Sequence, residues 1–218
     1  VTVTCHNAIR YFDEITMNRY HCKFHLTYHI GLPRLQTCGY SIPQRGGLRT
    51  IVHVGAILPG RPVARFAKFI EKFERVRFVQ FGNVAASELT FRYEQYSIKS
   101  PRMATDAMAT SDAILVCDLD SGFGYTPYLP SKFAYALALG RPVICLTTPD
   151  SEMARLSRLI KGVYFIDMTM PFSSDAVALI EDFTDGKLSA PSISDIGFVS
   201  PEAVANLFLK RVKETLQK

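Results

Sequence analysis

The sequence lacks the segments by which several classes of protein are recognised. No stretch of its 218 residues reaches the roughly 18 consecutive apolar residues of a membrane-spanning helix. Its start lacks the basic and apolar regions of a signal peptide. Neither GxGxxG nor GxxxxGK followed by Ser or Thr occurs, so NAD binding and P-loop ATP binding have little support. There is also no solenoid-type repeat and no low-complexity segment.

Cysteine is sparse, and its arrangement argues against cross-linking. The five cysteines are an odd number, and no CxxC pair occurs. Cys117 and Cys145 lie in apolar, strand-like runs, where thiols are usually buried in the core. We therefore expect reduced thiols and a cytoplasmic location.

One cysteine has several histidines close to it in the sequence. Cys22 lies among His21, His25 and His29, which are residue types that bind metals. The histidine spacing would suit a helix. However, residues 24–30 alternate as a strand does, and a strand sends alternate side chains to opposite faces. We therefore predict no metal site.

The charge of the chain is moderately positive. The formal net charge is +5, with 48% apolar and 21% charged residues, as in soluble globular proteins. Such a charge could favour phosphates, nucleic acid or an anionic membrane surface, but simple solubility explains it as well. Basic residues cluster on the expected solvated face of one helix and at its exit: Arg65, Lys68, Lys72, Arg75 and Arg77. We expect no nucleic-acid partner.

The length allows one large domain or one and a half small ones. The chain opens on valine within an apolar alternation, and we expect it to be a fragment whose upstream part is missing. Residues 1–30 predict a strand, a helix over 7–20 capped by Asn7, and a second strand over 26–30. Residues 31–48 are rich in proline and glycine, which predicts a linker or long loop.

From Thr50 onward, apolar strand-like runs alternate with amphipathic stretches. The runs predict strands at 51–54, 76–81, 89–93, 113–117, 143–146 and 163–166. The amphipathic stretches predict helices at 61–74, 100–110, 130–139, 150–160, 173–183 and 200–216, with Ser100 and Ser200 as caps. The fold class is therefore α/β: a Rossmann-like parallel sheet of about six strands with helices on both faces.

Ligands in such a sheet bind beyond the carboxyl ends of the strands. Gly55 follows the first of these strands and would let a ligand approach the backbone. Arg61 could bind a diphosphate bidentately, although an exposed arginine after a tight turn fits as well. Asp118 and Asp120 close the strand at 113–117 and could bind a metal or a sugar hydroxyl; we favour turn caps.

The segment from Tyr128 to Leu146 contains a loop, a helix and a buried strand. Pro130 suits the first position of the helix, and Gly140 ends it. A helix N-terminus beside the carboxyl ends of parallel strands can bind an anion, and Lys132 would add a full positive charge there. The alternative is a packing helix with an ordinary solvated lysine.

This segment resembles a known family. Pro130-Ser131-Lys132, followed by Ala138-Leu139-Gly140-Arg141-Pro142-Val143-Ile144, is similar to the PSK…aaGrPVi segment of GT-B fold glycosyltransferases, and a weaker resemblance extends along residues 50–185. In that family the segment lies in the C-terminal half, which binds the nucleotide-sugar donor. The resemblance implies a remnant of an N-terminal domain at 1–30, a linker at 31–48 and a nucleotide-sugar-binding domain at 49–218.

The resemblance also implies roles for single residues. Those expected to bind the donor phosphates are Gly55, Arg61, Ser131 and Lys132. Those expected to bind the nucleoside and sugar are Tyr96, Tyr128, Pro130 and Tyr135. No cofactor is expected, because the nucleotide-sugar is itself the donor substrate.

The implied function is that of a hexosyltransferase of polysaccharide biosynthesis, acting on a glycan, a lipid-linked or a small-molecule acceptor. The acceptor site would lie in the missing N-terminal domain, so we expect this fragment alone to be inactive. That domain is also the route by which a cytoplasmic enzyme of this kind would contact the inner face of a membrane.

Some positions depart from the family pattern. The family's paired glutamates correspond here to Pro127 and Tyr135, and its usual arginine after the first glycine is Ala56. Tyr135 can make a single hydrogen bond to a ribose hydroxyl but cannot chelate a diol. These departures favour one alternative, a non-catalytic GT-B-like binding or regulatory module. The other alternative is an unrelated Rossmann-like nucleotide-binding enzyme.

Overall fold

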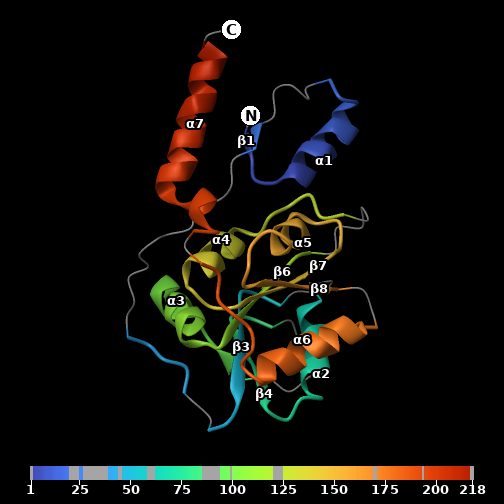
Figure 1. The fold of residues 1–218 in the computed structure, drawn as a ribbon, viewed down its shortest axis with the longest axis vertical. Helices are drawn as coiled ribbons and strands as arrows, with labels where there is room; N and C mark the ends of the chain where they lie inside the picture. Colours follow the sequence, from blue (N-terminus) through green and yellow to red (C-terminus); the bar gives the residue numbers. More distant parts are fainter. Residues whose placement is uncertain are drawn as a thin grey trace.

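The computed structural model describes residues 2–19, 25–26, 39–43, 46–57, 62–84, 94–98, 100–119, 125–168, 171–192 and 194–216. Its centre is a parallel sheet of six strands in the order β5-β4-β3-β6-β7-β8. The strands are β3 (Arg49–Val54), β4 (Val76–Phe81), β5 (Glu94–Tyr96), β6 (Ala113–Cys117), β7 (Val143–Thr147) and β8 (Val163–Asp167). The predicted fold class is confirmed (Figure 1).

The strands are buried because helices cover both faces of the sheet. On one face, α2 (Val63–Ile70) and α6 (Ser174–Thr184) pack on the side chains of Ile51, Phe78 and Leu115. On the other lie α3 (Pro101–Thr110), α4 (Ser131–Ala138) and α5 (Glu152–Ser157) (Figure 1). Strands β4, β6 and β7 are buried at every position, which explains their unbroken apolar runs.

Serine caps set the starts of several helices. The Ser100 hydroxyl accepts from the Met103 N–H at 3.1 Å, and Ser200 does the same for Ala203 at 3.1 Å, as predicted. The second cap starts α7 (Pro201–Leu216), which follows a short 3-10 turn, η3 (Gly197–Val199), between the helices predicted at 173–183 and 200–216. Helix α4 begins at Ser131, one residue after the Pro130 that was predicted to occupy its first position.

Two predictions concern the segments on either side of β4. The strand predicted at 89–93 falls outside the described residues, and β5 occupies Glu94–Tyr96, between that predicted strand and the helix predicted at 100–110. The helix predicted over 61–74 is shorter, because α2 ends at Ile70 and a turn carries the chain to β4. Strand and helix boundaries depend on tertiary contacts that sequence patterns do not contain.

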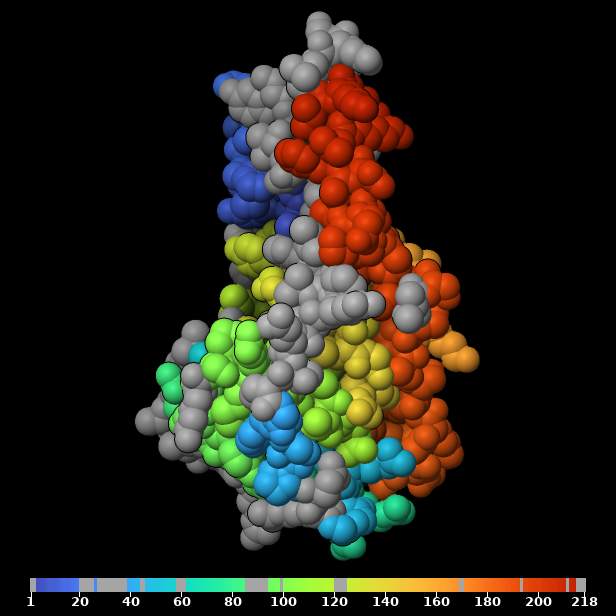
Figure 2. Space-filling view, turned by 90° about the vertical axis from the view of Figure 1, so that its left-hand side faces the viewer, coloured from blue at the N-terminus to red at the C-terminus, as the bar shows by residue number. Residues whose placement is uncertain are grey.

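The N-terminal residues form a second, two-stranded sheet with a helix, called here the N-terminal unit. Strands β1 (Thr2–Val3) and β2 (His25–Leu26) pair in parallel, and helix α1 (His6–Thr16) follows β1 along the chain. The predicted cap is wrong: α1 begins after Cys5, and the Asn7 side chain bonds to another part of the protein. This unit and α7 lie at the same end of the molecule (Figures 1 and 2).

Candidate functional site

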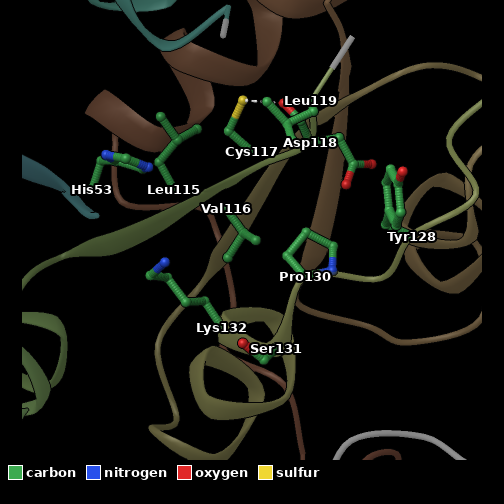
Figure 3. Close-up of a pocket in the computed structure, with 10 residues that line it drawn as sticks. All are labelled: His53, Leu115, Val116, Cys117, Asp118, Leu119, Tyr128, Pro130, Ser131 and Lys132. Carbon is green, nitrogen blue, oxygen red and sulfur yellow. Dashed lines mark hydrogen bonds between the residues drawn. The ribbon is translucent and has the colours of Figure 1, made fainter. Parts of the chain in front are cut away.

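A cavity of about 220 Å³ opens at the carboxyl ends of β3 and β6. These two strands are neighbours, but the chain runs from β3 toward β5 on one side and from β6 toward β8 on the other. Such a switch point leaves a crevice between the diverging connections, and α/β proteins commonly bind ligands there. The lining residues are His53, Leu115, Val116, Cys117, Asp118, Leu119, Tyr128, Pro130, Ser131 and Lys132 (Figure 3).

Lys132 reaches from the first turn of α4 to the end of β3. A Cβ placed on Gly55 would lie 3.1 Å from Lys132 Nζ and 3.3 Å from its Cε. Gly55 also has a φ of +140°, a backbone conformation that residues other than glycine rarely adopt. The glycine therefore provides both the backbone shape and the space that the lysine ammonium occupies.

A second glycine, Gly82, leaves space for the backbone of Gly55. A Cβ on Gly82, at the end of β4, would lie 2.5 Å from the carbonyl oxygen of Gly55. The Gly55 N–H donates to Phe81 O at 2.8 Å, so the ladder between β3 and β4 continues to the cavity wall. The ends of these two strands can approach this closely because Gly82 carries no side chain.

His53 is a cavity residue that the sequence reasoning missed. It is 3% exposed, and its Nδ1 lies 2.7 Å from Gln80 Oε1, its register partner on β4. The Gln80 amide nitrogen donates to Gly55 O at 2.5 Å, so its oxygen is the end that faces the histidine. An amide oxygen only accepts, so Nδ1 carries the proton in this arrangement. The signal available in the sequence was a pair of polar residues, one in each of two otherwise buried strands.

Asp118 is the acidic residue of the cavity lining. It is 1% exposed, directly follows β6, and its N–H donates to Leu146 O at 3.1 Å. Its carboxylate accepts a hydrogen bond from the Thr147 hydroxyl on β7. Figure 3 shows Lys132 and His53 on one side of the cavity and Asp118 with Tyr128 on the other. The cavity therefore has a basic side and an acidic side.

The buried cysteines are core thiols, as predicted. Cys117 lines the cavity, and its thiol donates to Asp118 O at 3.0 Å. Cys145 is fully buried in β7, and burial raises the pKa of its thiol well above the usual value. Cys22 and Cys38, with His21 and His29, lie outside the described residues. Within the described part of the chain, His, Cys, Asp and Glu form no group that could hold a metal ion.

The structure brings most of the expected site residues together. Gly55, Ser131 and Lys132 meet at the cavity, and Tyr128 and Pro130 line it. Arg61 and Asp120 lie outside the described residues.

The two remaining tyrosines lie elsewhere. Tyr96 stacks on Phe81 with ring centroids 5.1 Å apart, and its hydroxyl donates to Glu94 at 3.2 Å. Tyr135 is half-buried on α4. Neither belongs to the described lining of the cavity.

Known proteins resemble this chain in structure. No family model and no curated protein matches its sequence. The GtfA/B complex superposes over 100% of this chain with a TM-score of 0.64 and 9% identity. The lipopolysaccharide outer core galactosyltransferase WaaB covers 93% with a TM-score of 0.65 and 13% identity. Anabaena Alr3699/HepE, solved in complex with UDP and glucose, covers 100% with a TM-score of 0.65 and 14% identity.

These similarities define the fold of the chain, which is that of a GT-B glycosyltransferase. The identities of 9–14% carry the comparison no further than the fold. The chain spans 45%, 59% and 62% of the length of the three solved structures. No helix in the described part of the chain is long and apolar enough to cross a membrane.

Proposed function

We propose that the cavity binds the diphosphate of a nucleotide-sugar, and that the chain is the donor-binding half of a glycosyltransferase. The observation that carries this proposal is the position of Lys132. Its ammonium packs against the Gly55 backbone at the mouth of a switch-point cavity, beside the start of α4. A fixed cation and a helix N-terminus at one place favour a ligand with concentrated negative charge.

The first turn of α4 contributes backbone groups as well as charge. The Phe133 N–H donates to Pro130 O at 2.9 Å, while the N–H groups of Ser131 and Lys132 precede the helical ladder. An anion at this point would accept hydrogen bonds from them. The solved structure of HepE with UDP and glucose shows that a protein of this fold can hold such a ligand.

The chemistry proposed for the site is leaving-group stabilisation. Transfer of the sugar breaks its bond to the diphosphate, and negative charge develops on the departing oxygen. Lys132 and the helix N-terminus would stabilise that charge without moving, because they are already in place. Asp118, across the cavity, would accept hydrogen bonds from sugar hydroxyls.

The departures from the family pattern favour a second candidate function, that of a non-catalytic binding module. Pro127 and Tyr135 stand where the family has glutamates, and Pro127 is buried with its carbonyl bonded to Cys5. A module that binds a nucleotide-sugar or nucleotide without transferring the sugar is consistent with this. The hexosyl donor, the acceptor, a role in polysaccharide biosynthesis, the cytoplasmic location and contact with a membrane remain predictions.

Calorimetric titration of the chain with UDP, GDP and dTDP tests the proposal. We expect one nucleotide to bind, and Lys132→Ala to weaken it by at least about tenfold through the loss of a charge-assisted contact. Lys161→Ala is the matched control. This exposed lysine lies just before β8, at the amino end of that strand, whereas the cavity lies at the carboxyl ends of β3 and β6. Equal affinity in the Lys132 variant would refute the proposed site. Binding of ADP or NAD alone would favour an unrelated nucleotide-binding enzyme.

A further inference from the structure

Helix α1 contacts the segment that leads into the cavity. The Glu14 carboxylate accepts from the Tyr125 hydroxyl at 2.6 Å, and the Arg10 guanidinium lies 4.0 Å from the centre of the Tyr125 ring. The Asn7 amide donates to Thr126 O at 3.1 Å, and the Cys5 thiol donates to Pro127 O at 3.2 Å. Successive residues of one segment are thus each held by the N-terminal unit.

The held segment has no regular secondary structure of its own. Residues 125–130 form neither helix nor strand, although Tyr125, Thr126 and Pro127 are buried. Their carbonyl groups must find partners, since a buried peptide oxygen without one is costly. Side chains of the N-terminal unit supply those partners to Thr126 and Pro127.

A second contact fixes where α1 stands. Glu152, which is 2% exposed at the start of α5, accepts from the His6 N–H at 3.4 Å and lies 3.2 Å from His6 Nδ1. The Arg10 guanidinium pairs with Asp150 at 2.8 Å, and the Asn7 amide also donates to Asp150 O at 2.5 Å. The helix therefore bridges two parts of the sheet domain, the 125–127 segment and the turn before α5 (Figure 1).

The held residues are adjacent in the chain to the cavity lining. Tyr128 follows Pro127 directly, and Pro130, Ser131 and Lys132 complete the path into α4. The position of Tyr128 and the path of the chain into the first turn of α4 thus depend on a segment that helical and strand hydrogen bonds do not fix, while the buried face of α4 holds the rest of that helix. We propose that α1 is a positioning element of the cavity: it holds 125–127 so that Tyr128 and Lys132 stand where a diphosphate binds. This inference rests on the proposed function. Whether α1 holds the 125–127 segment is tested separately from nucleotide binding.

Charge and burial at Tyr125 fit this role. Burial and the hydrogen bond to Glu14 raise the pKa of Tyr125 to about 12, and the same bond holds the pKa of Glu14 below its usual value. The hydroxyl therefore stays protonated and donates throughout the neutral range.

The test uses the whole chain with Asn7→Ala and Glu14→Ala combined. Glu14→Gln is the conservative variant, because a glutamine oxygen still accepts from the Tyr125 hydroxyl. Ile15→Ala is the control on the same helix, where the side chain is 57% exposed. Amide hydrogen exchange without nucleotide and calorimetric affinity for UDP, GDP and dTDP are measured on each, with circular dichroism to confirm folding.

We expect the double variant to exchange faster at residues 126–133 and to bind its nucleotide about tenfold more weakly. Glu14→Gln and Ile15→Ala should stay within about twofold of the parent chain. Unchanged exchange and affinity in the double variant would overturn the inference. If the parent chain binds no nucleotide, the proposed function fails, and the exchange data alone decide whether α1 positions the segment.

Discussion

The ammonium of Lys132 and the α-carbon of Gly55 occupy neighbouring positions, so a side chain on residue 55 would press against the ammonium. The point at which a Gly55 Cβ would stand is 3.1 Å from Lys132 Nζ. Residues 77 positions apart in the chain therefore depend on each other. The consequences extend to the strand ends and to the N-terminal unit, and each can be measured.

Gly55→Ala should lower both the unfolding free energy of the chain and its affinity for the nucleotide. Its φ of +140° should make alanine cost about 1–3 kcal/mol in unfolding free energy, and the new methyl should displace the lysine. We expect nucleotide affinity to fall by about tenfold or more. Gly46→Ala is the control, because a Cβ there meets no atom within 4 Å. Equal affinity in both variants would show that the lysine needs no such fixed position.

Gln80→Leu should destabilise the sheet beside the cavity. The substitution removes the partner of His53 Nδ1 and the donor to Gly55 O, both in buried surroundings. Leaving these groups without the amide should cost about 2–4 kcal/mol of unfolding free energy, measured by urea denaturation. Gln95→Leu is the comparison, since this exposed glutamine donates to Gly82 O at 2.9 Å and should cost less than about 1 kcal/mol. A similar loss of unfolding free energy in both variants would mean that the burial of the Gln80 amide does not set its contribution to stability.

Tyr125 should make the chain sensitive to alkaline pH. Burial and the Glu14 bond raise its pKa from 10.0 to about 12. Between these values the unfolded chain loses the tyrosine proton while the folded chain keeps it, so stability falls as pH rises from about 10 to 12. The contribution is present in full below pH 10 and is lost by about pH 12.

Tyr125→Phe is the variant that isolates this effect. Its unfolding free energy should be lower than that of the parent chain at neutral pH, because the bond to Glu14 is lost. The gap between the two proteins should narrow above pH 10. A gap that stays constant to pH 12 would contradict the assignment.

Arg77 should anchor the stretch before β3 to the sheet. Its guanidinium is 7% exposed and donates to Thr50 Oγ1 at 2.8 Å and to Pro43 O at 2.6 Å, with Glu94 at 3.4 Å. Arg77→Met should cost about 3 kcal/mol of unfolding free energy, because Glu94 and the Pro43 carbonyl lose a buried partner. Arg65→Met, at an exposed position of α2, should change stability by less than about 0.5 kcal/mol. Thermal or urea unfolding of the two variants measures the difference.

Much of the sheet was predictable because its strands are buried on both faces. Runs such as 113–117 and 143–146 admit few interpretations in a chain where strands and helices alternate. The start of α4 and Lys132 were predictable for a local reason, since proline, serine and glycine mark the ends of a short helix. The cavity lining at Tyr128 and Pro130 followed from the family resemblance.

Other features depend on contacts between distant segments, and local patterns do not contain them. Arg77 was predicted to lie on a solvated face, yet it is buried because Pro43, Thr50 and Glu94 converge on it. Asn7 has the form of a helix cap, but its amide bonds to carbonyl groups more than 100 positions away. His53 became a cavity residue through its register with Gln80, which depends on strand pairing.

The contacts of α1 also have a consequence for the order in which the protein is assembled. The bonds of α1 to Tyr125 and Glu152 span 111 and 146 positions, and the bond of its N-cap Cys5 to Pro127 spans 122. A ribosome makes α1 before its partners on the sheet domain, which are synthesised more than 100 residues later. Closing such long loops is entropically costly, so the sheet should form before α1 docks. Although α1 is translated before the sheet domain, it would then be among the last of the described elements to acquire hydrogen-exchange protection in a pulse-labelled refolding experiment.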